Sequence, residues 1–135
     1  MKSLSLSQSQ LIRVTIMGVI LWFAAAMLLR WLGPMGVHEG MWRVLMYALI
    51  VPGTLPFVFL VKRIAGLEDH QVALGYAAAT TAAMLCDGLA LAWVPDLYGG
   101  RADLVVGAGA AILWGAGVGI VLAFLVNKPA NQKEG

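Results

Sequence analysis

Charged residues are scarce in this sequence: they make up 12% of its 135 residues, against about 25% in soluble domains. Hydrophobic residues make up 61%, which is more than the core of a water-soluble fold of this length would hide. The net charge of +2 is small and the basic residues are scattered, so the composition indicates no nucleic-acid partner. We therefore expect an integral membrane protein whose main contact is the lipid bilayer.

Cysteine and the familiar catalytic motifs are also lacking. The single cysteine, Cys86, excludes an internal disulfide and any multi-cysteine metal site, and we interpret it as a small buried residue. His38 and Glu39 fall in one predicted loop and the acids and histidine of residues 68–70 in another, which is too few ligands in either place for a metal centre. No G-x-S-x-G, HExxH, P-loop or Rossmann pattern occurs. The sequence predicts no catalytic residues, no metal and no cofactor, and hence no enzyme.

Four long apolar segments follow one another along the chain, each close to the roughly 20 residues that a helix needs to cross a bilayer. They cover residues 14–32, 44–61, 72–94 and 104–126, and the short polar tails are residues 1–13 and 127–135. The connections are too short to fold separately. The sequence therefore predicts one domain over residues 1–135 with an all-α fold, a four-span transmembrane helix bundle.

The first segment also imitates a secretory signal peptide. Lys2 and Arg13 precede an apolar stretch that ends in three alanines at residues 24–26. The apolar run continues beyond those alanines through Leu29. We therefore expect a retained first span.

The basic residues are divided unevenly between the two sides of the predicted bundle. Six lie in the tails and the second loop (Lys2, Arg13, Lys62, Arg63, Lys128 and Lys133), and three lie in the first and third loops (Arg30, Arg43 and Arg101). Short cytoplasmic segments carry the excess of lysine and arginine, so both termini are predicted in the cytoplasm and the chain in a bacterial inner membrane. Interfacial aromatic residues are expected at the opposite face: Trp31, Trp42, Trp93 and Tyr98.

Small residues recur every four positions in the last two spans, so that each row lies on one helix face. The fourth span has Gly107, Ala111, Gly115, Gly119 and Ala123; the third has Ala78, Ala82, Cys86 and Ala90. Such faces let another helix approach closely inside a membrane. Either the two spans pack on each other within one bundle, or the same face binds a second copy or a larger membrane partner.

The second span contains Pro52 and Pro56, one helical turn apart. Each proline removes a backbone donor and crowds the carbonyl one turn back, so a kink is predicted here. The kink is either a static feature that shapes the bundle, or a hinge whose freed carbonyls face a polar cavity beside Asp87.

Asp87 is the only acidic residue inside the predicted spans, about 10 Å from the outer end of its own span. An acid in hydrocarbon costs free energy unless it has a partner. Its own helix offers only Thr80 and Cys86 nearby, so the partner is expected from another helix, with Arg30 and Arg43 as candidates. Three interpretations stay open: a structural ion pair, a proton or cation site that titrates during transport, and a neutral acid held by hydrogen bonds.

In size and helix count the sequence resembles the small multidrug resistance transporters. Those proteins place their essential glutamate in the first helix, where this sequence has no acid. Two stretches, MLCDGLALAWVPDLYG at residues 84–99 and ILWGAGVG at residues 112–119, resemble an uncharacterised family of small bacterial four-helix membrane proteins, a domain-of-unknown-function family. That resemblance implies a four-helix inner-membrane protein with the Asp87-Gly88 pair as a family feature, and it implies no activity.

The function expected from these features is a non-enzymatic accessory or assembly component of a membrane complex or homo-oligomer. The alternative is a small proton- or cation-coupled transporter that uses Asp87 and the kinked second span.

Overall fold

The structure, a computed structural model, describes residues 5–130. Over this range the chain forms four long α-helices and two short 3-10 helices: α1 (Gln8–Leu32), η1 (Gly33–Met35), α2 (Gly40–Ala65), α3 (Val72–Trp93), η2 (Pro95–Tyr98) and α4 (Ala102–Val126). Each of the four long helices is long and apolar enough to cross a membrane. The all-α class and the four predicted helices are confirmed, whereas Lys2 and Lys133 of the charge pattern lie outside the described residues.

Local sequence signals set the helix ends. The Ser7 hydroxyl accepts a hydrogen bond from the Gln10 amide and the Gln10 side chain accepts one from the Ser7 amide, so α1 begins at Gln8, ahead of the apolar segment. At the end of α2, Gly66 adopts a φ of 70°, which glycine adopts without steric cost. This turn lets the Leu67 amide reach the Lys62 carbonyl at 2.9 Å and closes the helix.

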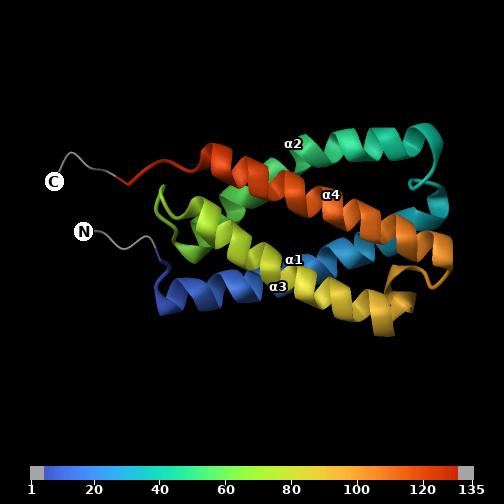
Figure 1. Ribbon diagram of the computed structural model, residues 1–135, viewed down its shortest axis with the longest axis horizontal. Helices are drawn as coiled ribbons and strands as arrows, with labels where there is room; N and C mark the ends of the chain where they lie inside the picture. Colours follow the sequence, from blue (N-terminus) through green and yellow to red (C-terminus); the bar gives the residue numbers. More distant parts are fainter. Residues whose placement is uncertain (1–4, 131–135) are drawn as a thin grey trace.

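The helices are not arranged in chain order around the bundle (Figure 1). The largest interface joins α1 to α3, while α4 packs on both α3 and α2. The helices α1 and α2 are consecutive in the chain, yet they share only a small interface. The side of the bundle between α1 and α2 is therefore its loosely packed side.

The start of α1 and the end of α4 lie at the same end of the bundle, called here the terminal end (Figure 1). Two side chains tie this end together: Gln10 donates to the Gly66 carbonyl at 2.9 Å, and Asn127 accepts from the Ala73 amide at 3.0 Å. The first bond connects α1 to the turn after α2, and the second connects the end of α4 to the first turn of α3. The opposite end, called the distal end, carries η1 and η2 in the other two turns.

The helices α1 and α3 approach each other closely at Gly18, where they cross. A Cβ on Gly18 would collide with the carbonyl oxygen of Ala79 and would lie 3.1 Å from the Cβ of Ala82. The alanine row of α3 thus meets α1 through Ala82, while Ala90 of the same row shares a buried cluster with Ala108 of α4. Ala78 packs against the same cluster, around Val14, Met17 and Ala79.

The small-residue row of α4 faces other elements of the bundle. Larger side chains from those elements, and not alanines, pack against its glycines. Gly119 lies under the ring of Tyr76, Gly107 under the ring of His38, and Gly115 is in contact distance of Ile50. Ala111 and Ala123 are buried in the same row. A glycine opposite a large side chain packs as closely as two small residues do, which explains why α4 accepts rings at these positions.

Pro52 and Pro56 lie inside α2, which continues through them. The half of α2 before the prolines (teal) stands away from α1 (blue), whereas the half after them (green) crosses to the other side of α4 (Figure 1). Two side chains donate hydrogen bonds to backbone carbonyls just before the prolines. Thr54 donates to the Ile50 carbonyl at 2.6 Å, and the Trp114 indole donates to the Tyr47 carbonyl at 3.0 Å.

The contact between Gly18 and Ala79 makes a direct prediction. Gly18→Ala places a methyl group against a backbone oxygen, which cannot rotate away, so α1 and α3 must separate. We expect the free energy of unfolding in detergent to fall by about 1–3 kcal/mol, the usual cost of overpacking.

Gly88→Ala on α3 is the matched control, because no atom lies within 4 Å of the added methyl group. This variant is expected to keep or slightly raise stability, since alanine favours helix. Equal unfolding curves for the two variants would show that the close crossing of α1 and α3 is wrong.

Candidate functional site

Asp87 receives its hydrogen bond from Tyr98. The Tyr98 hydroxyl donates to the carboxylate oxygen Oδ1 of Asp87 at 2.5 Å, and the Trp22 indole donates to the Tyr98 hydroxyl at 3.1 Å. Asp87 is 9% exposed and Tyr98 is fully buried. The result is a chain of polar groups from α1 through η2 to α3, inside an otherwise apolar part of the bundle.

The turn after α3 brings Tyr98 back into the bundle. Pro95 begins η2 just after α3 ends, and Gly99 follows Tyr98 with a φ of 105°, so the chain reverses within a few residues. The ring then packs among Ala26, Ala90 and Ala108, which come from three different helices. Their small side chains form the socket that a phenol ring needs.

The electrostatics favour this donor. Burial and the neighbouring carboxylate raise the pKa of Tyr98 above its usual value, so the phenol keeps its proton and acts as a donor at neutral pH. A neutral hydroxyl thereby stabilises the carboxylate without bringing a second charge into the bundle.

The arginines expected to pair with Asp87 lie elsewhere. Arg30 is exposed near the end of α1 and Arg43 is exposed on the first turn of α2, and no ion pair within residues 5–130 joins either one to Asp87. The position beside the carboxylate is taken by Tyr98, and an arginine there would have to desolvate a second charge. Thr80 lies two turns from Asp87 and lines the same cavity.

Sequence reasoning missed both donors. Tyr98 was expected at the membrane interface with Trp31, Trp42 and Trp93; those three side chains are exposed at the distal end, but Tyr98 is buried. Trp22, for which the sequence predicted no polar role, packs edge-on against Phe23 while its N–H donates to the Tyr98 hydroxyl. The only signal was that Asp87 needed a donor, and nothing in the chain order indicated which turn would supply it.

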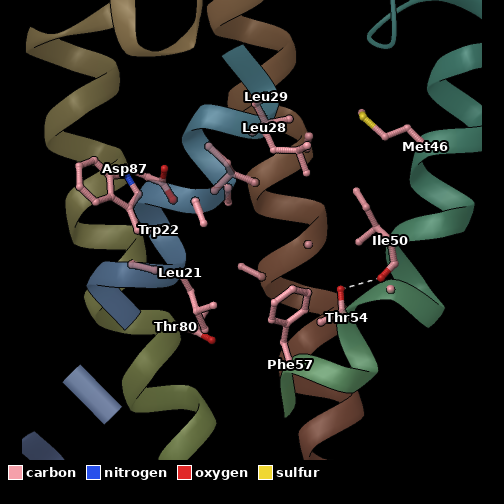
Figure 2. A pocket seen from close by; sticks show the side chains of 18 of the residues that line it. Leu21, Trp22, Leu28, Leu29, Met46, Ile50, Thr54, Phe57, Thr80 and Asp87 are labelled. Carbon is pink, nitrogen blue, oxygen red and sulfur yellow. Dashed lines mark hydrogen bonds between the residues drawn. The ribbon is translucent and has the colours of Figure 1, made fainter. Parts of the chain in front are cut away.

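Asp87 also lies on the wall of a large opening in the bundle (Figure 2). This cleft, of about 660 Å³, lies between α1 and α2 and reaches α3 and α4 at its back. Leu21 and Leu28 line it from α1, and Met46, Ile50 and Phe57 from α2, as Figure 2 shows. The lining is almost entirely apolar, and Asp87 is its only ionisable carboxylate.

The chemistry available in this cleft is limited. Within residues 5–130 no group of three or more histidine, cysteine, aspartate or glutamate side chains is placed to hold a metal ion. The Thr54 hydroxyl in the cleft lining is committed to a backbone carbonyl. The arrangement therefore suits the binding of an apolar group, beside a carboxylate that is already hydrogen-bonded.

Comparisons with family models, curated protein sequences and solved structures found no match to this chain. The likeness of residues 84–99 and 112–119 to a family of small four-helix membrane proteins stays a prediction.

The hydrogen bond to Asp87 can be tested by a double-mutant cycle. Tyr98→Phe leaves a buried carboxylate without its donor, so we expect the free energy of unfolding in detergent to fall by about 1.5–3 kcal/mol. The double variant Asp87→Leu/Tyr98→Phe removes both partners and is expected to recover most of this loss.

Arg30→Gln and Arg43→Gln serve as controls in the same assay and are expected to unfold like the unmodified protein. If Arg43→Gln or Arg30→Gln costs as much as Tyr98→Phe, the carboxylate has an arginine partner and the assignment to Tyr98 fails.

Proposed function

We propose that this protein is a non-enzymatic component of a bacterial cytoplasmic membrane, an accessory or assembly subunit whose cleft receives a transmembrane helix of a partner. Four helices long and apolar enough to cross a bilayer support the membrane location. Arg13, Lys62, Arg63 and Lys128 belong to the terminal end, which supports cytoplasmic termini. The observation that carries the proposal is the open, apolar cleft between α1 and α2.

The lining of the cleft favours a helix as its occupant. Ala24 and Ala25 are exposed on α1, and Gly53 on α2 has no atom within 4 Å of the position of a Cβ. Short side chains on both walls let another backbone approach closely, which is how helices associate where lipid removes the hydrophobic drive. Ala83 and Ala116 continue this lining on α3 and α4.

The state of Asp87 is compatible with such a partner. The Tyr98 hydroxyl already donates a hydrogen bond to Asp87, and the Trp22 indole donates one to Tyr98. An entering helix therefore does not have to supply a cation. The partner helix belongs to a second copy of this chain or to another membrane protein, and the same experiment distinguishes the two.

Filling the cleft is expected to prevent assembly without unfolding the protein. Ala25→Leu and Gly53→Leu add side chains that occupy the space of the partner helix. Chemical crosslinking in native membranes, followed by native electrophoresis, is expected to show a complex for the unmodified chain and its loss in both variants.

Gly117→Leu is the matched control, because Gly117 is exposed on α4, outside the cleft lining, with no neighbouring atom within 4 Å. A complex that survives both cleft variants, or that Gly117→Leu disrupts equally, refutes docking in the cleft. Crosslinks between two tagged copies of the chain identify a homo-oligomer.

A second candidate function rests on the position of Asp87 and Thr80 in the cleft lining, since acids in this setting often serve proton- or cation-coupled carriers. If the protein carries protons, Asp87→Asn abolishes proton flux into proteoliposomes under a membrane potential while the variant stays folded. Asp96→Asn, at an exposed position in η2 outside the cleft, keeps the flux. Equal proton leak with and without the unmodified protein excludes this candidate.

A further inference from the structure

A second cavity, of about 600 Å³, lies at the distal end between η1, the start of α2 and the start of α4. We call it the distal pocket. It shares no lining residue with the cleft. Its volume falls in the range of about 300–1,000 Å³ that is usual for small-ligand sites. Whereas the cleft has Asp87 as its one acid, four charged side chains line the distal pocket: Glu39, Arg43, Arg101 and Asp103.

Two of these four charges are already paired with each other. Arg101 donates to both carboxylate oxygens of Asp103, at 3.1 and 2.8 Å. Among the residues that the structure describes, the side chains of Arg43 and Glu39 take part in no hydrogen bond or ion pair. They lie one helical turn apart, where the Arg43 amide bonds to the Glu39 carbonyl at 3.1 Å. The pocket thus contains a guanidinium and a carboxylate, one helical turn apart, whose hydrogen-bonding groups are available to a ligand.

His38 adds a polar atom that lacks a partner. Its Nε2 is buried and has no hydrogen bond, while its ring lies over Gly107 and near Gly33. Burial lowers the pKa of His38, although the nearby carboxylates of Asp103 and Glu39 act in the opposite direction, and the imidazole is neutral at neutral pH. A neutral ring nitrogen in a polar pocket is suited to a hydrogen bond with a ligand.

The backbone around the pocket favours an anionic group. The helices α2 and α4 both begin here, and neither start has a hydrogen bond from a capping side chain. The free amides at the start of α2 and the positive end of its helix dipole therefore face this region, whereas the first turn of α4 already carries the Asp103 carboxylate. Together with Arg43 the amides of α2 suit a phosphate, while Glu39 suits an ammonium group.

The surroundings indicate a ligand that is part polar and part apolar. Trp31, Trp42 and Trp93 are exposed at the distal end, as expected of side chains at headgroup depth. Tyr47 lines the pocket and stacks on Trp114, with ring centroids 5.6 Å apart, and so extends an apolar surface from the pocket along α2 and α4. A soluble zwitterion makes no use of this surface, whereas acyl chains do.

We propose that the distal pocket binds the headgroup of a zwitterionic phospholipid with a primary ammonium, such as phosphatidylethanolamine. The phosphate lies at Arg43 and the start of α2, the ammonium lies at Glu39, and the acyl chains follow the Tyr47–Trp114 stack. The four charged side chains of the pocket balance, which favours a zwitterion over an anionic lipid. This proposal is independent of helix docking in the cleft, because the two cavities have no residue in common.

The test is lipid retention measured by native mass spectrometry of the protein purified in detergent. The protein is exposed to an equimolar mixture of phosphatidylethanolamine, phosphatidylcholine and phosphatidylglycerol with identical acyl chains. The unmodified protein is expected to retain phosphatidylethanolamine above the other two. Arg43→Gln removes a charge-assisted contact and is expected to lower this retention about tenfold. Glu39→Gln is expected to abolish the preference over phosphatidylglycerol.

Arg30→Gln is the matched control: Arg30 is also an exposed arginine at the distal end, but it does not line the pocket, and its loss should leave retention unchanged. Arg43 and Glu39 are exposed, so unchanged thermal unfolding confirms that their variants are folded. Equal retention of the three lipids, preference for phosphatidylglycerol, or equal effects of Arg43→Gln and Arg30→Gln overturns the proposal. Retention of soluble phosphoethanolamine without retention of phosphatidylethanolamine assigns the pocket to a soluble zwitterion and overturns the lipid assignment.

Discussion

The hydrogen bond from Tyr98 to Asp87 is the interaction on which the distal half of the bundle depends. A carboxylate in an apolar bundle needs a donor, and helix α3 has none to offer at that position. The donor comes from η2, which places the turn between α3 and α4 inside the bundle. Trp22 then joins α1 to the same hydroxyl. The need of the Asp87 carboxylate for a hydrogen-bond donor therefore connects α1, α3 and η2.

This arrangement leaves α2 as the helix with the least support. Gly18 lets α1 pack closely on α3, and Gly119 lets α4 pack closely on α3. By contrast, α2 has a large interface only with α4. Its two prolines interrupt the backbone hydrogen bonds in the middle of the helix. The apolar cleft and the charged distal pocket are both lined by α2, through different residues. Both proposed binding sites thus follow from one loosely packed helix.

The comparison of sequence and structure is clearest at the aromatic residues. The rule that tryptophan and tyrosine gather at span ends matches Trp31, Trp42 and Trp93, which are exposed at the distal end. The same rule misplaced Tyr98, because Ala26, Ala90 and Ala108 form its socket and belong to helices far apart in the chain. In the same way, the row of small residues on α4 was visible in the sequence, but its contacts with Tyr76 and His38 were not.

Four long apolar helices, and an Asp87 that requires a partner within them, follow from the amino-acid sequence alone. Both conclusions depend on local composition and on the cost of a charge in an apolar setting, and neither needs knowledge of distant residues. The packing of the helices sets the remaining features: the partner of Asp87 is Tyr98 and not an arginine, Gly18 meets Ala79, and the cleft opens between α1 and α2. These outcomes depend on which side chains, distant in the chain, fill the same space.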